Sequence, residues 1–309
     1  MLSYTQNLED YHLWQALGGP SPGFYIDVGG GHPIADNVSF WFYERGWRGI
    51  IVEPQAPLAE LYQHIRPRDE VVVGLVGRAP GELDFHVFDR LHGLSTTVKQ
   101  HAETGGAHEQ YRVERRPVTT LAALCEKHRV ERIDFLKVDV EGAEADVLAG
   151  NDWKRFRPKV VVCEAIAPLS NEPAWDKWEP YLLAQGYRFC LYDQLNRFYV
   201  AEEAEDVLAR MPRERAPWES ATHMYEIGRA PDNAKHPEHE LARKLARGFW
   251  ASLPELDPRL LAGLMARADG QRPSEADLQK SALALTSDEN RARLGRIACG
   301  YDGGQLFDD

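Results

Sequence analysis

A short apolar run that ends in three glycines constrains the fold of this chain most. Phe24-Tyr25-Ile26-Asp27-Val28 is compact and apolar enough for a buried strand, and Gly29-Gly30-Gly31 follow it directly. Further runs rich in Val and Ile, at 49–53, 133–138 and 159–163, alternate with stretches of helical periodicity. Near-continuous apolar strands of this kind are typical of a parallel sheet that helices cover on both faces. The alternation therefore predicts a doubly wound α/β fold.

Two departures from this rhythm shape the prediction. The last two strands, at 187–192 and 197–200, are separated only by the turn Gln194-Leu195-Asn196, which predicts an antiparallel hairpin near the sheet edge. Before them, the stretch from Asp89 to Gln110 is polar and contains glycines, and it predicts an insertion or a long active-site loop.

Beyond residue 202 the pattern changes character. With 309 residues, the chain is long enough for two domains. Proline-containing breaks fill the stretch 206–236, and four helical patterns follow from residue 238 onward without a strand candidate. We therefore expect an α/β domain at 1–205, a linker at 206–236 and a small all-helical domain at 237–309.

Composition disfavours several classes of binding partner and several cellular locations. The chain has 48 acidic and 36 basic side chains, a formal charge of −12, which disfavours nucleic acid as the main partner. No apolar run approaches the ~18 residues needed to cross a bilayer, and the first residues lack the basic and apolar regions of a secretory signal. Four scattered cysteines are typical of a reduced compartment, so we expect a cytoplasmic protein without membrane insertion.

The glycine turn predicts a ligand site at the end of the first strand. Asp27 lies two residues before Gly29, and Gly29 and Gly31 form a G-x-G pair. Ile34 stands where a dinucleotide fingerprint has its third glycine, which weakens a pyrophosphate interpretation. An acidic residue before G-x-G without a phosphate-binding lysine suits S-adenosylmethionine. An ordinary strand-to-helix turn is the alternative.

Two more strand ends carry charged side chains. Glu53 ends the second strand, where a carboxylate can accept hydrogen bonds from both ribose hydroxyls; a surface glutamate that precedes a helix start at Pro54 is the alternative. Lys137, Asp139 and Glu141 follow an apolar strand, and burying them is costly unless they pair or bind a ligand. A solvated strand end with a Lys137–Asp139 pair is the alternative there.

Taken together, these motifs resemble the FkbM family of S-adenosylmethionine-dependent methyltransferases, over about two-thirds of the chain. The resemblance implies a Rossmann-like seven-stranded sheet and O-methylation, commonly of sugar hydroxyls or polyketide-type substrates, and it is nearest to members linked to cell-surface polysaccharide assembly. The segments that carry it are Ser3–Asp10, Tyr25–Gly30, Gly46–Pro54, Gly93–Thr96, Val118–Leu121, Phe135–Gly142 and Leu195–Val200.

The resemblance also implies roles for individual residues. The cofactor loop would consist of Asp27, Gly29 and Gly31, with Glu53 on the ribose. The strand end around Leu75 would border the adenine. Asp139 and Glu141 would face the methyl-transfer centre, and Asp139 would also border the cofactor.

Methyl transfer to a hydroxyl needs a group that removes the proton. Asp139 is our first candidate for this base, and His32 and His92 are its rivals. His32 departs from the family pattern, and it is either specific to the substrate or caps the following helix.

The acceptor side of the site is predicted from three further residues. His92 and Ser95 lie in the long loop, whose hydroxyls we expect to bind cofactor or acceptor, and Glu164 ends another strand. Asp139, Glu141 and Glu164 could together hold Mg²⁺. We favour instead a Glu164 that is hydrogen-bonded to a loop, and hence no metal.

The sequence thus predicts an S-adenosylmethionine-dependent O-methyltransferase that acts on a sugar or glycan. The alternatives are a nicotinamide- or nucleotide-sugar-dependent enzyme on the same sheet, and a non-catalytic scaffold protein. The helical domain at 237–309 is expected to mediate a homodimer, to dock a glycosyltransferase or to pack on the catalytic domain.

Overall fold

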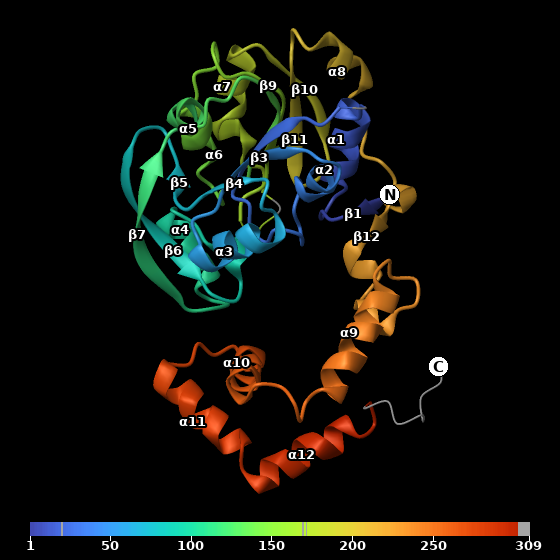
Figure 1. The fold of residues 1–309 in the computed structure, drawn as a ribbon. Coiled ribbons are helices and arrows are strands. Elements are labelled where there is room, and N and C mark those ends of the chain that lie inside the picture. Colours follow the sequence, from blue (N-terminus) through green and yellow to red (C-terminus); the bar gives the residue numbers. More distant parts are fainter. Residues whose placement is uncertain (20, 169, 171, 302–309) are drawn as a thin grey trace. The chain divides into compact units, whose positions relative to one another are not determined.

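The structure of the chain is a computed structural model that describes all residues except 20, 169, 171 and 302–309. Contacts divide the chain into two compact units, Met1–Met224 and Tyr225–Asp309 (Figure 1). The predicted helical domain at 237–309 falls in the second unit, and its last eight residues lie outside the described part.

The first unit is built on a seven-stranded sheet with the strand order β10-β11-β9-β8-β2-β3-β4. Five of the strands are parallel neighbours, and β11 runs antiparallel to both β9 and β10, as the predicted hairpin requires. The strands are β2 (Phe24–Val28), β3 (Arg48–Val52), β4 (Glu70–Val72), β8 (Ile133–Val138), β9 (Pro158–Glu164), β10 (Tyr187–Tyr192) and β11 (Asn196–Ala201).

The order in which strands are added to the sheet reverses at β2. From β2 the sheet grows outward through β3 and β4, and the chain then returns to place β8 on the other side of β2. Ile26 in β2 consequently lies between Ile50 of β3 and Leu136 of β8. Right-handed crossovers in opposite directions put helices on opposite faces, so the strand order agrees with the predicted doubly wound arrangement.

Apolar strands and helix faces make one continuous core in this unit. Every residue of β8 is buried, and Val160–Val162 in the centre of β9 are fully buried, which explains why most residues of these two strands are apolar. Thr120 begins one of the helices, and its hydroxyl accepts a hydrogen bond from Ala123 N at 3.1 Å. The helices are α1 (Glu9–Leu17), α2 (Phe40–Glu44), α3 (Ala56–Ile65), α5 (Leu121–Lys127), α6 (Glu144–Ala149), α7 (Glu179–Ala184) and α8 (Glu205–Arg210).

A second, three-stranded sheet interrupts the alternation after β4. It has the order β5-β7-β6, with β5 (Leu75–Val76), β6 (Gly81–Phe88) and β7 (Tyr111–Thr119). The valine-rich run over 70–76 predicts one strand, and this prediction is wrong, because the chain leaves the main sheet at the exposed Val73 and the buried Gly74. The expected insertion at 89–110 contains the short 3₁₀ helix η1 (His92–Leu94) and the helix α4 (Lys99–Gly105).

The predicted linker begins inside the first unit. β1 (Leu2–Ser3) pairs with β12 (Thr222–His223), and α8 packs against α1. Residues 206–224 therefore belong to the first unit and do not form a free connection. Short 3₁₀ helices occupy Trp175–Lys177, Trp218–Ser220, Met224–Glu226 and Ala230–Asp232.

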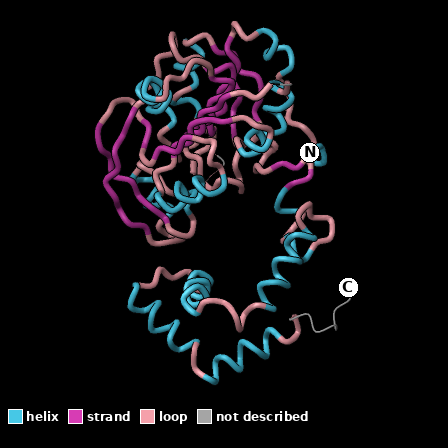
Figure 2. Tube along the Cα trace, in the orientation of Figure 1, coloured by secondary structure: helices cyan, strands magenta, loops and turns pink. Residues whose placement is uncertain are grey.

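The second unit contains helices and no strand among its described residues, as Figure 2 shows. Its helices are α9 (His239–Ala251), α10 (Pro258–Ala268), α11 (Glu275–Leu285) and α12 (Asp288–Ala298). The side chains of Asp257, Ser274 and Ser287 accept backbone hydrogen bonds at the first turns of α10, α11 and α12. A small cluster around Leu253, Leu261 and Ala298 forms its core.

No helix in the described part of the chain is both long and apolar enough to span a membrane.

Candidate functional site

A cavity of about 860 Å³ opens where the strands β2, β3, β8 and β9 end. Open α/β sheets bind their ligands outside the carboxyl ends of the strands, at the point where the strand order reverses. In this sheet that point lies between β2 and β8. The volume of the cavity lies in the range of small-molecule sites, about 300–1,000 Å³. The cavity is lined chiefly by residues 28–32, 52–55, 74–83, 92–95, 139–141, 164 and 166–168.

The glycine turn after β2 brings the backbone close to the neighbouring strand end. Gly29 has φ +80°, and a Cβ added there would lie 1.7 Å from the carbonyl oxygen of Asp139. Gly31 has φ +57°, and a Cβ there would meet nothing within 4 Å. The first glycine is thus required by a close approach, whereas the second leaves an open surface of backbone toward the cavity.

Glu53 lies directly after β3 and supports this turn. Its side chain is buried; one carboxylate oxygen accepts Gly31 N at 2.9 Å and the other accepts Gln55 N at 2.7 Å. Burial raises the pKa of Glu53 to about 7, against the lowering effect of these two hydrogen bonds. A carboxylate accepts about four hydrogen bonds, so two lone pairs remain for a ligand, and a ribose contact stays a prediction.

Asp27 lies beneath the cavity and not on its wall. It is fully buried, accepts a hydrogen bond from Ser39 Oγ at 2.7 Å and lies 3.6 Å from Lys137 Nζ. Lys137 Nζ also donates to Gly29 O at 2.8 Å and pairs with Asp139 at 3.2 Å. Burial alone would lower the pKa of Lys137, but the carboxylates of Asp139 and Asp27 raise it above its usual range. Asp27 therefore positions the turn through Lys137.

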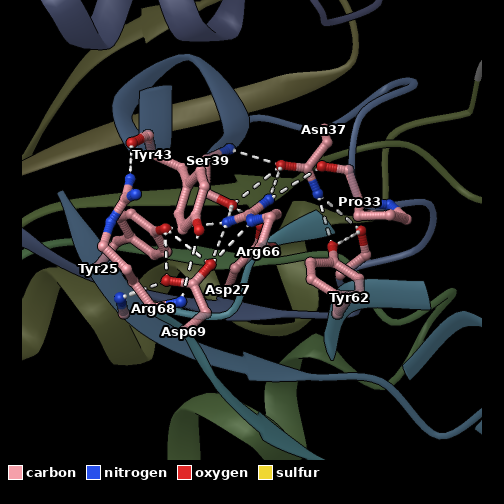
Figure 3. A network of polar contacts seen from close by, with 12 residues as sticks. Tyr25, Asp27, Pro33, Asn37, Ser39, Tyr43, Tyr62, Arg66, Arg68 and Asp69 are labelled. Carbon is pink, nitrogen blue, oxygen red and sulfur yellow. Dashed lines mark hydrogen bonds and ion pairs between the residues drawn. The ribbon is translucent and has the colours of Figure 1, made fainter. Parts of the chain in front are cut away.

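A buried arginine holds the segment that follows the glycine turn (Figure 3). The guanidinium of Arg66 has no exposed surface and pairs with Asp69 at 2.7 Å. It donates to Asn37 Oδ1 at 2.8 Å, to Ser39 Oγ at 2.9 Å and to Pro33 O at 3.2 Å. These contacts fix the path of residues 33–39 and, through Ser39, the position of Asp27.

Three carboxylates converge at the ends of β8 and β9. Asp139, Glu141 and Glu164 each offer an oxygen that lies within 4.8 Å of the other two. Burial and the charge of Asp139 raise the pKa values of Glu141 and Glu164 well above the usual range of a glutamate. Glu164 is only 8% exposed, and its Oε2 has no hydrogen-bond partner among the described residues. The loop hydrogen bond that we favoured for Glu164 is thus absent at this atom.

The long loop is fastened to this cluster. Thr96 Oγ1 donates to the carbonyl oxygen of Glu141 at 2.8 Å, and His101 Nδ1 lies 3.0 Å from the same oxygen. His92 and Ser95 both line the cavity, and Ser95 Oγ accepts Phe88 N at 3.0 Å, which leaves its hydrogen to donate. Both predicted acceptor-side residues of the loop therefore reach the cavity, and their contacts with a ligand remain predictions.

His32 lines the cavity but is occupied with its own turn. Its Nδ1 accepts Ile34 N at 3.1 Å and Ala35 N at 2.9 Å. The neutral ring therefore carries its hydrogen on Nε2, which leaves no nitrogen lone pair to take a proton. Burial lowers the pKa of His32, so the ring stays neutral near pH 7. This geometry argues against a catalytic base, and His32 holds the turn at 34–35 and does not cap the helix α2, which begins at Phe40.

Of the remaining residues, Leu75 lines the cavity as the resemblance implied, whereas Glu144 went unpredicted. Glu144 is buried and accepts Gly142 N at 3.0 Å and Val140 N at 3.2 Å, which holds the turn that carries Glu141. An acidic residue three positions after Glu141, at a helix start, was the available signal.

Fold and cavity define an α/β protein with a small-molecule site at the ends of its parallel strands. The profile of the family described as "Methyltransferase FkbM domain" matches residues 27–189, and the chain belongs to this methyltransferase family. The sequence-based identification of the family is thereby confirmed. A comparison with curated proteins finds no match.

Solved structures show weaker similarity. An O-methyltransferase from Bacillus cereus in complex with SAH is 12% identical at a TM-score of 0.35, over 64% of this chain and 80% of that one. The glycopeptide N-methyltransferase MtfA is 10% identical at a TM-score of 0.34, over 65% of this chain and 94% of that one. WbdD, in a complex with a kinase inhibitor, is 13% identical at a TM-score of 0.32, over 63% of this chain and 39% of that one.

Proposed function

We propose that this protein is an S-adenosylmethionine-dependent O-methyltransferase that transfers a methyl group to a hydroxyl of a sugar or glycan. One observation carries the proposal. A single cavity runs from the glycine turn and Glu53, at the ends of β2 and β3, to the carboxylates at the ends of β8 and β9. We expect this cavity, at the ends of the parallel strands, to accommodate the cofactor at one end and the acceptor at the other.

The residues present fit a nucleoside cofactor that carries an amino acid moiety. The open backbone at Gly31 allows close approach, the free lone pairs of Glu53 suit ribose hydroxyls, and Leu75 offers an apolar wall. When bound, the cofactor supplies an electrophilic methyl group on a sulfonium. The contribution of the protein is to hold the acceptor oxygen in line with that methyl carbon.

Proton removal falls to the carboxylate cluster. As the acceptor oxygen bonds to the methyl carbon and the carbon–sulfur bond breaks, the hydroxyl proton passes to a carboxylate, for which Asp139 is our first candidate. The ion pair with Lys137 fixes the Asp139 side chain at 3.2 Å, and the side chain is one-third exposed toward the cavity. Glu141, Glu164, His92 and Ser95 surround the place where the acceptor would bind.

Calorimetry and turnover assays test this function. We expect S-adenosylmethionine to bind and NAD and a nucleotide sugar not to bind, with binding lost in Glu53→Ala. We expect Asp139→Asn to keep cofactor binding and to lower kcat about 10²–10⁴-fold with a glycan acceptor. Asp206→Asn is the matched control, because that side chain is 74% exposed on α8. Binding of NAD or the nucleotide sugar in place of S-adenosylmethionine would overturn the proposal, and binding of none of them would favour a scaffold.

We propose further that the first unit holds the whole catalytic site, since all described residues that line the cavity belong to Met1–Met224. The helical unit is then free for a partner, a second copy or a glycosyltransferase. Comparing the mass in solution of the full chain with that of a chain lacking 231–309 tests the dimer, which fails if both have the same oligomeric state.

A further inference from the structure

The cluster at the ends of β8 and β9 carries more negative charge than its neighbours balance. Asp139, Glu141 and Glu164 lie within 4.8 Å of one another, and Glu144 adds a fourth acidic group that acts on Glu141 and Glu164. Lys137 pairs with Asp139 at 3.2 Å, and it also lies 3.6 Å from Asp27. Carboxylates buried this closely must either keep protons or bind a cation.

Glu164 distinguishes a binding site from a merely acidic surface. The side chain is 8% exposed and lines the cavity, and its Oε2 finds no hydrogen-bond donor in the described part of the chain. Leaving a buried carboxylate oxygen without a partner costs free energy. A cation in the cluster would give this oxygen the partner that it lacks.

The spacing of the oxygens selects the kind of cation. Two ligands of one ion are separated by at most twice the bond length, about 4.6–5.2 Å for Ca²⁺ and about 4.0–4.2 Å for Mg²⁺. Three ligands equally spaced around one ion are separated by at most about 1.7 bond lengths, about 4.0–4.5 Å for Ca²⁺ and about 3.5–3.6 Å for Mg²⁺. Separations of up to 4.8 Å therefore bring the oxygens within a closure of less than about 1 Å of a Ca²⁺ site, and Mg²⁺ or Mn²⁺ requires a closure of up to about 1.3 Å. Three carboxylates without sulfur or imidazole favour hard cations of this group over zinc or copper.

We propose that Asp139, Glu141 and Glu164 bind one hard divalent cation at the acceptor end of the cavity. The site draws one ligand from each of three positions, two on the turn after β8 and one at the end of β9. The turn is held in place by Glu144 and by the contacts of Thr96 and His101 with the carbonyl oxygen of Glu141.

The effect of this cation on the reaction rests on the proposed function. A divalent cation that binds an acceptor hydroxyl lowers the pKa of that hydroxyl and fixes its orientation. The proton would still pass to a carboxylate oxygen of the cluster, and the methyl-transfer products are unchanged. Asp139 would then serve as a ligand of the cation as well as a partner of Lys137.

The test measures cation binding directly on the full chain, without turnover. Protein freed of metal by chelator is titrated with Mn²⁺, free Mn²⁺ is followed by electron paramagnetic resonance, and Ca²⁺ and Mg²⁺ are added as competitors. We expect one site per chain, at least tenfold weaker in Glu164→Gln and in Glu141→Gln. Asp206→Asn should change the affinity less than twofold, because that side chain is 74% exposed on α8, pairs with Arg210 at 2.9 Å and does not line the cavity.

Folding of the variants does not obscure the result. Glu164→Gln removes a buried negative charge next to two others, so in metal-free buffer we expect it to melt at or above the temperature of the original protein. Added Mn²⁺ should then raise the melting temperature of the original protein and leave that of the variant unchanged.

Two outcomes overturn the inference: no stoichiometric Mn²⁺ binding at millimolar concentration, or an unchanged affinity in Glu164→Gln. In the first case the cluster holds a shared proton between Glu164 and Asp139, or it awaits an ammonium group on the acceptor. Calorimetry with S-adenosylmethionine on the same metal-free protein separates this failure from failure of the proposed function. If the cofactor binds and Mn²⁺ does not, only the proposed cation site is overturned. If Mn²⁺ binds and the cofactor does not, only the proposed cofactor is overturned.

Discussion

Two glycines in one turn offer an internally matched test of how the site is built. Gly29 and Gly31 both have left-handed backbones, at φ +80° and φ +57°. They differ in what a side chain would meet, because Gly29 faces the carbonyl oxygen of Asp139 and Gly31 faces open space. Replacing each in turn by alanine separates the cost of the backbone conformation from the cost of the close approach.

The magnitudes follow from the geometry. Both alanines pay for a left-handed backbone, about 1–2 kcal/mol, and recover part of it through a less flexible unfolded chain, so Gly31→Ala should cost about 1 kcal/mol. In Gly29→Ala the Asp139 carbonyl must also retreat from 1.7 Å to at least the 3.4 Å of ordinary contact. That movement strains the Asp139 N to Val28 O hydrogen bond of 3.0 Å and the buried packing around it. We expect about 3–5 kcal/mol in total.

Scanning calorimetry of the full chain is the assay, since it can resolve separate transitions for the two units. For a unit of about 200 residues, 1 kcal/mol shifts the midpoint by about 2–4 °C. The first unit should therefore melt about 2–4 °C lower in Gly31→Ala and about 10 °C lower in Gly29→Ala, and the helical unit should not change. Equal shifts in the two variants would refute the close approach as the reason for Gly29.

Two further predictions concern buried charges. The pKa of Glu53 is raised by burial from 4.5 to about 7, so the folded state keeps a proton that the unfolded chain has lost, and the side chain destabilises the fold progressively as pH rises through this window. Urea unfolding at pH 5.0 and 7.5 should show the original protein losing about 2.4 kcal/mol relative to Glu53→Gln, and parallel pH profiles would contradict this. Arg66→Met should cost about 3–5 kcal/mol, because Asp69 is left buried without its ion pair. The control Arg210→Met breaks an exposed pair with Asp206, and it should cost less than about 1 kcal/mol; similar losses in both variants would show that the network around Arg66 adds nothing.

The central sheet could be predicted because its strands are covered on both faces. Phe24–Val28 has the bounds that the sequence suggested, since burial imposes apolar residues along most of this strand. Tyr187–Tyr192 also has the suggested bounds, although it is an edge strand on which Arg188 and Phe189 are exposed. The site residues at the strand ends could also be predicted, because glycines and acidic residues directly after an apolar strand are seldom required by the fold itself. The cavity accordingly contains Gly29, Gly31, Glu53 and the carboxylates after β8.

The excursion and the supporting network could not be predicted in the same way. β7 (Tyr111–Thr119) has one buried residue among nine and contains three arginines and a glutamate, so it has no apolar pattern to mark it as a strand. Arg66 lies in a polar stretch after α3, where an arginine normally faces solvent. Its burial depends on partners brought together only by the fold, among them Asn37, 29 positions earlier in the chain.

The way in which the chain enters and leaves the three-stranded sheet has a consequence for how such proteins diversify. Leu75 and Val76, where the chain enters the three-stranded sheet, pair with Val118 and Thr119, where it leaves that sheet. The inserted segment therefore begins and ends at neighbouring positions. Most of the residues between can change in number or identity while the seven-stranded sheet keeps its register, apart from Thr96 and His101, which contact the turn after β8. Evolution could therefore change the part of the cavity wall that the inserted segment supplies, including the loop with His92 and Ser95, while the strand ends of the seven-stranded sheet stay the same.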